Sequence, residues 1–314
     1  MRIIDRPELA PLTTLGIGGR ALAEIRLEQP EDCERLPETL SRIGGFVRVL
    51  GGGSNLLVHD GDLPFVVLRP LFGATDEKGR AADPVVLGEE EGTEGERVLI
   101  RAGAGIRVPH LLSWCARHDL SGLEGLVGVP GRLGGAVAMN AGAYGCSTAP
   151  LLRSLDVFTP EKGLHTLSGD GWTFRYRHFS LADPCAWYMS VSAVLSLRRA
   201  APGSVRAAVK ENFLHKKSGQ PVHEHTAGCV FQNPEGQSAG RLLDQAGMKG
   251  RRCGAMFFSP MHANFLAHDM KCGMPGRSAD ALELIEEARS AVRREFGVEL
   301  VMEVKEWGHG PDER

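Results

Sequence analysis

The sequence of 314 residues predicts an α+β protein with more than one compact unit. Stretches with the periodicity of strands and of helices are mixed along the chain, and glycine-rich turns separate several of them. The length exceeds that of one usual domain, so we expect two or three units around a shared site. We set the domain boundaries at residues 1–70, 71–200 and 201–314.

The first predicted strands flank a cluster of glycines. Residues 46–50 form a short apolar run rich in β-forming side chains, which stops at a Gly-Gly-Gly-Ser-Asn sequence and resumes at residues 56–58. This order predicts a strand, a tight turn and a second strand. Residues 74–96 are rich in Asp, Glu and Gly, which predicts a solvated surface excursion.

The middle of the chain contains both periodicities. Residues 98–102 are strand-like, and residues 108–118 have the spacing of an amphipathic helix. Between residues 188 and 197, apolar side chains alternate with serines. This alternation predicts a half-buried strand that closes the middle domain.

The last part of the chain predicts one helix and one strand. Apolar residues recur at helical spacing over 281–296, Asp280 lies near the start, and Gly297 follows as a stop signal. Residues 300–304 then predict a final strand.

Composition and charge exclude several classes of protein. A content of 42% hydrophobic and 24% charged residues is that of an ordinary globular protein. The 36 Lys and Arg residues against 39 Asp and Glu give a net charge of -3, and no basic stripe is interleaved with aromatic residues, so no nucleic-acid partner is expected. No stretch is long and apolar enough to predict insertion into a membrane.

The cysteines and the amino-terminal residues indicate a cytoplasmic protein. Seven cysteines are scattered without a C-x-x-C pair, and residues 1–14 lack the continuous apolar core of a secretory signal. We therefore expect reduced thiols, without disulfides or a structural zinc. His223 and His225 have no third ligand placed beside them, so no metal site is predicted.

Two glycine-rich segments indicate a large phosphate-bearing ligand. Residues 51–55 could hold a phosphate on consecutive backbone N–H groups. A strand-like run and not a helix follows them, which disfavours a Rossmann site. A simple hairpin turn is the alternative for this segment. Residues 122–145 are a second dense segment of small residues, for which tight packing is the alternative. Two such segments favour an extended cofactor over a single phosphate.

Seven ordered blocks of residues and a final Glu-Val pair resemble one family across nearly the whole chain. The family is that of the UDP-N-acetylenolpyruvoylglucosamine reductases. The matching blocks are residues 14–19, 51–55, 125–145, 174–177, 227–234, 239–243 with 246–250, and 262–265, followed by Glu303-Val304.

This resemblance implies a fold and a reaction. The fold is the FAD-binding fold of the vanillyl-alcohol-oxidase type in two N-terminal lobes, with FAD between them, and a C-terminal domain that closes over a nucleotide-sugar. The reaction is the NADPH-dependent reduction of UDP-N-acetylglucosamine enolpyruvate to UDP-N-acetylmuramate, a peptidoglycan precursor, with FAD bound non-covalently. The lack of a long insertion between Arg177 and Cys229 matches the shorter form of the family. We expect a monomer or a weak oligomer.

The resemblance also assigns binding residues. Residues expected to bind FAD are Gly51, Gly52, Gly53, Ser54, Asn55, Gly128, Pro130, Gly134, Gly135, Ala136, Asn140 and Gly142. Residues expected to bind the substrate are Tyr176, Asn233, Lys249, His262 and Asn264, and a buried hydrogen-bonded histidine is the alternative for His262.

Three residues are expected to carry the chemistry. The family pattern places Arg177 at the enolate, because a guanidinium grips a carboxylate with two parallel bonds and keeps its proton. Cys229 stands where the family usually has a serine as proton donor, and a thiol with a reference pKa of about 8.5 can take over that role. Glu303 matches the acidic partner of the enolic intermediate. Taken singly, an exposed ion pair for the arginine and a buried apolar thiol for the cysteine are the alternatives.

A second departure from the family and two other readings stay open. Gln232 stands where the family commonly has a lysine, so Lys249, Arg241 or Lys217 is needed to supply that charge. An FAD-dependent oxidase of the same fold is one alternative function, and such enzymes often attach flavin covalently to histidine. A non-catalytic nucleotide-binding protein is the other, and the presence of all three catalytic residue types argues against it.

Overall fold

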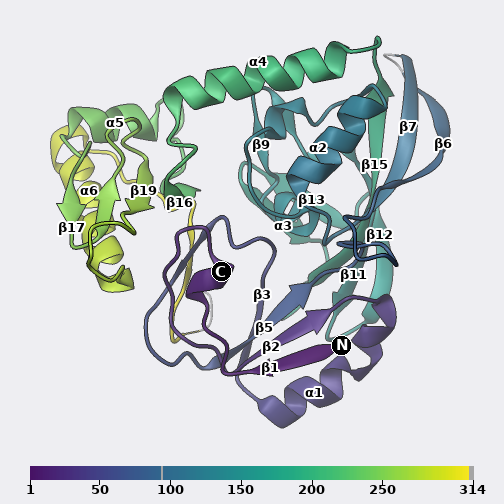
Figure 1. Ribbon diagram of the computed structural model, residues 1–314, viewed down its shortest axis with the longest axis horizontal. Coiled ribbons are helices and arrows are strands. Elements are labelled where there is room, and N and C mark those ends of the chain that lie inside the picture. Colours follow the sequence, from purple (N-terminus) through teal and green to yellow (C-terminus); the bar gives the residue numbers. More distant parts are fainter. Residues whose placement is uncertain (93–94, 311–314) are drawn as a thin grey trace. The chain divides into compact units, whose positions relative to one another are not determined.

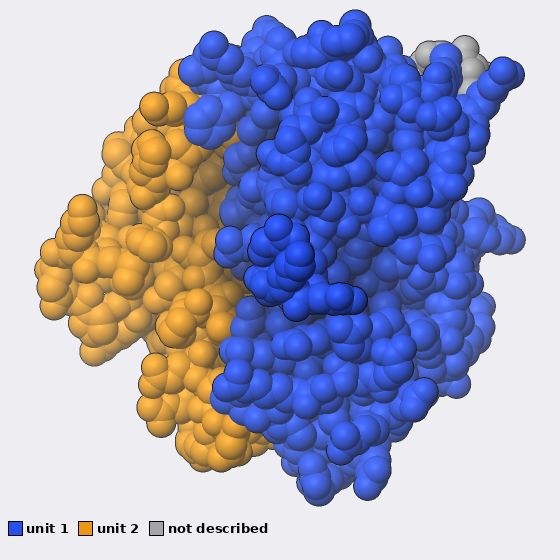
Figure 2. Space-filling view, turned by 45° about the vertical axis from the view of Figure 1, so that its right-hand side comes forward, with its two compact units in different colours: residues 1–4, 23–52, 66–215 blue, residues 5–22, 53–65, 216–314 orange. Residues whose placement is uncertain are grey.

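The computed structural model describes residues 1–92 and 95–310, which fold into two compact units (Figures 1 and 2). Unit 1 contains residues 1–4, 23–52 and 66–215, and unit 2 contains residues 5–22, 53–65 and 216–314. The chain therefore enters unit 2 three times, whereas the domains expected at 1–70, 71–200 and 201–314 are consecutive. Those three boundaries stay predictions. In the part of the chain described, no helix is long and apolar enough to cross a bilayer.

The smaller sheet of unit 1 has the strand order β1-β2-β5-β3, and β2 and β5 run parallel. Helix α1 packs on it through Leu36, which shares a core with Ile25, Leu27 and Leu68. Pro at its first turn and Gly44 after its end delimit the helix. The bounds are β1 Arg2–Asp5, β2 Ala23–Leu27, α1 Leu36–Ile43, β3 Phe46–Val49 and β5 Phe65–Pro70.

The larger sheet of unit 1 has six strands in the order β12-β11-β15-β7-β6, with β8 also paired to β15. Helices α2 and α3 contribute apolar side chains to its core, and the separate hairpin β13-β14 packs Phe179 against the same core. The bounds are β6 Val85–Gly92, β7 Gly95–Gly103, α2 Val108–Arg117, β8 Leu120–Ser121, α3 Leu133–Ala138, β9 Gly142–Ala143, β10 Cys146–Ser147, β11 Leu152–Thr159, β12 Gly163–Ser168, β13 Trp172–Arg175, β14 His178–Leu181, β15 Met189–Arg199 and α4 Ser204–Gly219.

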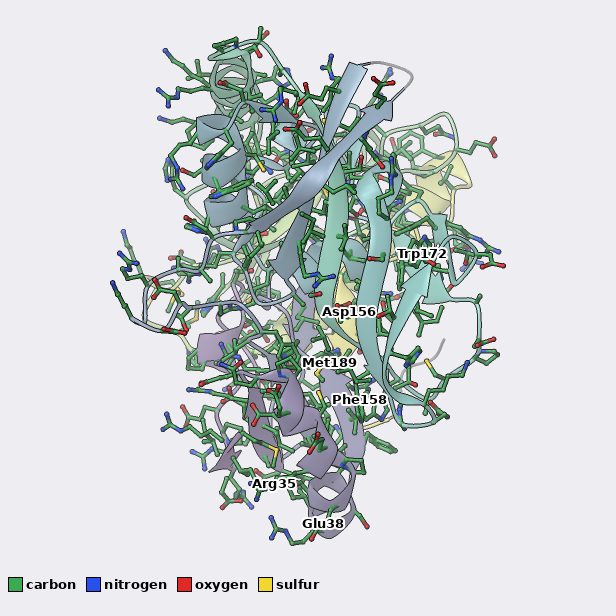
Figure 3. All side chains as sticks on the ribbon, turned by 90° about the vertical axis from the view of Figure 1, so that its right-hand side faces the viewer. Arg35, Glu38, Asp156, Phe158, Trp172 and Met189 are labelled. Carbon is green, nitrogen blue, oxygen red and sulfur yellow. The ribbon has the colours of Figure 1, made fainter. Side chains whose placement is uncertain are left out.

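Strand β15 lies between two partners and is more buried than its alternating pattern predicts. Ser190 and Ser196 are buried like the apolar residues between them, so the expectation of a half-buried strand is wrong. The Ser196 hydroxyl accepts from Arg97 Nε at 2.8 Å and donates to Glu90 at 2.7 Å, which satisfies its hydrogen bonds. Figure 3 shows Phe158 and Met189, which pair where β11 meets the start of β15.

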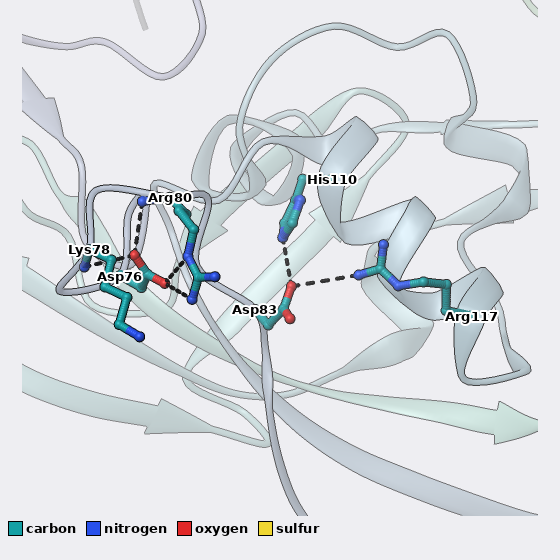
Figure 4. A network of polar contacts seen from close by, with 6 residues as sticks. All are labelled: Asp76, Lys78, Arg80, Asp83, His110 and Arg117. Atoms are coloured by element: carbon teal, nitrogen blue, oxygen red, sulfur yellow. Dashed lines mark hydrogen bonds and ion pairs between the residues drawn. The ribbon is translucent and has the colours of Figure 1, made fainter.

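Most of residues 74–91 in the predicted surface excursion are exposed or half-buried, the excursion also contains strand β6, and residues 93–94 lie outside the described part of the chain. Val85, Val86 and Leu87 are 60%, 51% and 46% exposed at the edge of the larger sheet. Before this strand, Asp76 accepts from the backbone of Lys78 and Arg80. Asp83 then contacts His110 at 2.8 Å and Arg117 at 3.7 Å, which ties the excursion to helix α2 (Figure 4).

Unit 2 is built on a four-stranded sheet, β16-β19-β18-β17, and a parallel pair, β4-β20. Helices α5 and α6 bury Leu243, Leu284 and Val292 in its core. As predicted, Gly297 ends α6 in the left-handed conformation, with φ 68°. The bounds are β4 Leu56–Val58, β16 His225–Cys229, α5 Ala239–Gln245, β17 Arg252–Cys253, β18 Met256–Phe258, β19 Phe265–His268, α6 Ser278–Phe296 and β20 Lys305–Trp307.

Two sequence expectations about strands are corrected in unit 2. Residues 300–304 make only an isolated bridge, between Met302 and Phe231, and the last strand is β20, which begins at Lys305. The hairpin alternative for residues 51–55 is also wrong. Strand β3 belongs to the smaller sheet of unit 1, whereas β4 pairs in parallel with β20, so the glycine turn does not join two paired strands.

Candidate active site

Backbone strain gathers around Arg177 in unit 1. Asn140, Tyr144 and Arg177 have φ angles of 38°, 51° and 54°, in the left-handed region that residues with a Cβ rarely adopt. Side chains connect them, because Asn140 Nδ2 donates to Arg175 O at 3.1 Å and Arg177 Nη1 donates to Gly142 O at 2.9 Å. Strained residues of this kind persist where the surrounding structure holds them, and they concentrate at functional sites.

Arg177 lies in a two-residue turn between strands β13 and β14. Its partner in the turn is Tyr176, which is 53% exposed, and the Arg177 guanidinium carbon lies 5.0 Å from the centre of the Tyr176 ring. The bond to Gly142 O and the ring contact restrict a long side chain that would otherwise be mobile. The structure thus presents one oriented cation beside an exposed aromatic ring, and both residues were predicted from sequence.

The two glycine-rich segments meet within unit 1. A Cβ on Gly51 would lie 3.3 Å from Gly135 Cα, and one on Gly52 would collide with Gly131 Cα. Only glycine permits so close an approach of two backbones. The two segments therefore pack backbone against backbone, as the alternative of tight packing requires, and cofactor binding by Gly51 and Gly52 stays a prediction.

Arg132 places a positive charge next to this glycine contact, and sequence reasoning did not single it out. It follows Gly131 and caps helix α3, which begins at Leu133, and its Nη1 donates to Gly105 O. Arg107 forms an isolated β-bridge with Arg132, and burial followed by the charges of Arg69 and Arg107 lowers the pKa of the Arg132 guanidinium. Arg69 shares the buried Glu24 with Arg26, at 2.8 Å and 2.7 Å from its Oε1. A net positive charge of this kind suits an anionic ligand.

Other predicted FAD residues of unit 1 are placed differently. The N–H of Gly134 donates to Ala104 O at 2.9 Å, and Ala136 is buried in the core beneath α3. Asn140 Oδ1 accepts from Ala149 N at 3.1 Å, so both ends of this amide hold loops. Gly128 lies with Arg117 and Arg206 at a cavity of about 300 Å³. Roles for these residues in cofactor binding stay predictions, as does the role of Pro130.

The end of the glycine turn belongs to unit 2. Gly53 has φ 66°, and its carbonyl accepts from Thr14 N at 3.0 Å. Asn55 Nδ2 donates to the carbonyl of Glu303 at 3.0 Å, and Asn55 O accepts from Lys305 N at the same distance. These bonds fix the turn that contains Ser54 to the segment that contains Glu303, across 248 residues of sequence.

Cys229 ends strand β16 after a local irregularity. The register of β16 against β19 shifts between Thr226 and Cys229, and Gly228 before the cysteine has φ 83°. A bulge re-aims the side chain that follows it and is common beside active sites. The positive φ angle explains why glycine precedes Cys229, because glycine allows the backbone turn that orients the thiol.

Cys229 and Glu303 are brought together in unit 2 through one backbone group. Val230, the residue after Cys229, accepts a hydrogen bond from Glu303 N at 2.7 Å. The next residue but one, Gln232, donates from its N–H to Val301 O at 2.9 Å. Two of the three predicted catalytic residues thus lie on adjacent segments, although 74 positions separate them in the sequence.

The predicted substrate residues of unit 2 have mixed environments. Lys249 is exposed and contacts Asp244 at 2.7 Å, and the side chain of Asn233 accepts from Ala239 N at the start of α5. His262 is half-buried, and burial lowers the pKa of its ring, so that neutral Nδ1 accepts from Asn264 N. Asn264 itself is 2% exposed, with both amide atoms bonded to Phe231.

Comparison with known families identifies both parts of the chain. A family described as "FAD binding domain" matches residues 21–168, and one described as "UDP-N-acetylenolpyruvoylglucosamine reductase, C-terminal domain" matches residues 220–307. The first match covers the contact between Gly52 and Gly131 and also Arg132. FAD is therefore the cofactor of this α+β protein.

Whole-chain relatives agree with these matches. A UDP-N-acetylenolpyruvoylglucosamine reductase of Nitratidesulfovibrio vulgaris is 44% identical, over 97% of this chain and 98% of the relative. That of Oleidesulfovibrio alaskensis is 46% identical with the same coverage. The crystal structure of the Thermus caldophilus reductase aligns with 98% of this chain and 99% of its own, at 34% identity and a TM-score of 0.77. The chain thus belongs to the family of UDP-N-acetylenolpyruvoylglucosamine reductases.

Proposed function

We propose that this protein reduces UDP-N-acetylglucosamine enolpyruvate to UDP-N-acetylmuramate in the cytoplasm, with NADPH as the reductant. The observation that carries the proposal is the hydrogen bond from Glu303 N to Val230 O. This bond holds Glu303 next to the segment that contains Cys229. Family membership supports the same conclusion, since relatives that match 97% of the chain are named UDP-N-acetylenolpyruvoylglucosamine reductases.

Bound FAD supplies the hydride that NADPH provides. Arg177 binds the carboxylate of the enolpyruvyl group and stabilises the negative charge that develops beside it during reduction. Its guanidinium suits this role because it keeps its charge and is already oriented by Gly142 and Tyr176. A preorganised donor needs no rearrangement at the moment of reaction.

Cys229 completes the reduction as general acid. Its Sγ–H donates a proton to the carbon on which the charge develops, and the thiolate then takes a proton from solvent. Glu303 hydrogen-bonds to the enolic intermediate. Tyr176, Asn233, Lys249 and His262 contact the nucleotide-sugar in this proposal. Lys249 supplies the charge that Gln232 lacks.

The proposal is tested by following the two half reactions separately. The purified holoprotein is reduced with NADPH without oxygen, and its flavin absorbance is recorded while the enolpyruvate is added. We expect prompt reoxidation together with formation of UDP-N-acetylmuramate. If NADPH reduces the flavin but the enolpyruvate does not reoxidise it, the proposed substrate is wrong. Flavin that stays attached to the denatured chain would favour the oxidase alternative.

Replacement of Arg132 by alanine is expected to weaken FAD binding about 10- to 100-fold, since a hydrogen bond to a charged group contributes about 1.5–3 kcal/mol. The measurement is a fluorescence titration of the apoprotein with FAD. Arg132→Lys keeps the charge and loses the planar guanidinium, so its affinity for FAD should lie between those of wild type and Arg132→Ala. The control is Arg153→Ala, which removes an exposed arginine paired with Glu90. An unchanged affinity in Arg132→Ala would remove this residue from the cofactor site.

A further inference from the structure

Asn264 makes an arrangement of hydrogen bonds that the predicted substrate contact does not explain. Its side chain is in the interior, with the residue 2% exposed. Oδ1 accepts from Phe231 N at 2.9 Å, and Nδ2 donates to Phe231 O at 2.8 Å. Both kinds of polar group on the amide are therefore engaged with the backbone of one residue, which lies two positions after Cys229.

These two bonds imitate a strand neighbour. Strand β16 ends at Cys229, where its partner on β19 is Phe265. Beyond that point, the side-chain amide of Asn264 gives Phe231 the same donor and acceptor that an opposite residue in an antiparallel pair would give. A peptide-like side chain thus extends the ladder past the irregularity at Gly228.

The neighbouring bonds connect this contact to both catalytic candidates of unit 2. Val230 N donates to the backbone carbonyl of Asn264 at 2.8 Å, while Val230 O accepts from Glu303 N at 2.7 Å. Phe231 in turn bridges to Met302. Residues 230–231 are therefore held by Asn264 on one side and by the segment of Glu303 on the other. A shift of these residues would move Cys229 relative to Glu303.

We propose that Asn264 is a positioning residue, which sets the Cys229 thiol relative to Glu303 by holding the backbone of Phe231. This role replaces the direct substrate contact that the sequence predicted for Asn264, and its catalytic consequence rests on the proposed function. The buried backbone of Phe231 requires one hydrogen-bond donor and one acceptor from the side chain at position 264. Aspartate has the right shape for this but satisfies the requirement only when it is protonated.

The decisive variant is Asn264→Asp, assayed over a range of pH. As a carboxylate, the new side chain accepts from Phe231 N but repels Phe231 O. As a carboxylic acid, it restores both bonds. Burial raises the pKa of such a group above the ordinary value of about 3.9. We therefore expect the rate of reoxidation by the enolpyruvate, relative to wild type at the same pH, to be at least tenfold lower at pH 8 and to recover toward pH 5.5. NADPH-driven flavin reduction should stay at the wild-type rate throughout.

Two companion variants define the interpretation. Asn264→Ala removes both bonds without adding a charge, so its loss of reoxidation should be similar at every pH. Asn212→Asp makes the same exchange on helix α4 and should behave like wild type. Thermal unfolding at each pH shows whether the variants are folded. If Asn264→Asp is not folded at pH 8, Asn264→Ala carries the test, and reoxidation within twofold of wild type in a folded Asn264→Ala would overturn the proposal. So would a folded Asn264→Asp whose relative rate does not depend on pH.

A readout without substrate separates this proposal from the proposed function. Cys229 is alkylated with iodoacetamide in the holoprotein, and its labelling is compared by peptide mass spectrometry with that of Cys253, which is also in unit 2. We expect the ratio of Cys229 labelling to Cys253 labelling in Asn264→Asp to differ several-fold from the wild-type ratio at pH 8. At pH 5.5 this ratio should approach the wild-type ratio. A change in labelling in a protein that does not use the enolpyruvate would support the positioning role and reject the function. Equal labelling in all variants would reject the positioning role.

Discussion

Replacement of Cys229 by alanine is expected to lower the rate of flavin reoxidation by UDP-N-acetylglucosamine enolpyruvate about 100- to 10,000-fold, the usual contribution of a general acid. The rate of flavin reduction by NADPH should not change, because the proton is needed only in the second half reaction. Stopped-flow absorbance under anaerobic conditions measures both rates. The bulge at Gly228, which orients the residue after it, is the structural basis for choosing this thiol.

Matched variants make the result specific to Cys229. Cys229→Ser provides the hydroxyl that the family usually has, and it should recover most of the lost rate. Because a thiol ionises in mildly alkaline solution and a hydroxyl does not, the serine variant should lose less rate than wild type between pH 7.5 and 9.5. Cys253→Ala removes another partly exposed thiol, and the rates of both half reactions in this variant should match those of wild type. Equal loss of both half reactions in Cys229→Ala would show that the residue is not the proton donor.

Replacement of Arg177 by asparagine is expected to slow the same reoxidation about 100- to 1,000-fold, because one preorganised donor to the developing charge is lost. Asparagine is chosen because it tolerates the left-handed conformation that Arg177 adopts, with φ 54°, so the turn between β13 and β14 should persist. Binding of the enolpyruvate should weaken as well, since the guanidinium also grips the ground-state carboxylate. Single-turnover rates over a range of substrate concentration separate the two effects.

The control for this variant is another arginine with positive φ. Arg6 has φ 42° and forms an exposed ion pair with Asp62 at 2.8 Å, so Arg6→Asn makes the same backbone and charge change elsewhere. Its half reactions should match wild type, because exposed pairs contribute little. If Arg177→Asn and Arg6→Asn slow reoxidation equally, Arg177 does not directly stabilise the charge that develops on the substrate.

The sequence was sufficient for features that local patterns encode. The helical spacing before Gly297 gave α6 and its end, because a helix buries one side of a repeat and stops where a left-handed residue is needed. Short apolar runs gave β3 and β4 on either side of the glycines. The ordered blocks of residues identified the family and FAD, both confirmed by the comparisons. The roles of Arg177, Cys229 and Glu303 stay predictions.

Features that depend on distant partners were beyond the local pattern. The serines of β15 suggest a solvated face, but Ser196 is buried, and Arg97 on the adjacent strand β7 and Glu90 on β6 satisfy its hydroxyl. The sequence predicts the apolar start of β6 as part of a surface excursion, since an exposed edge strand buries too little surface to impose a clear periodicity.

The sequence by itself determined the fold class, the family and the residue types available for the reaction. Only the tertiary structure decided which of them meet. Arg132 comes under the influence of the charges of Arg69 and Arg107, and Asn264 acquires its partner Phe231 across 33 residues. The physical reason is that periodicity and turn chemistry act over a few residues, whereas a hydrogen bond between distant segments depends on the packing of all the elements that bring them together.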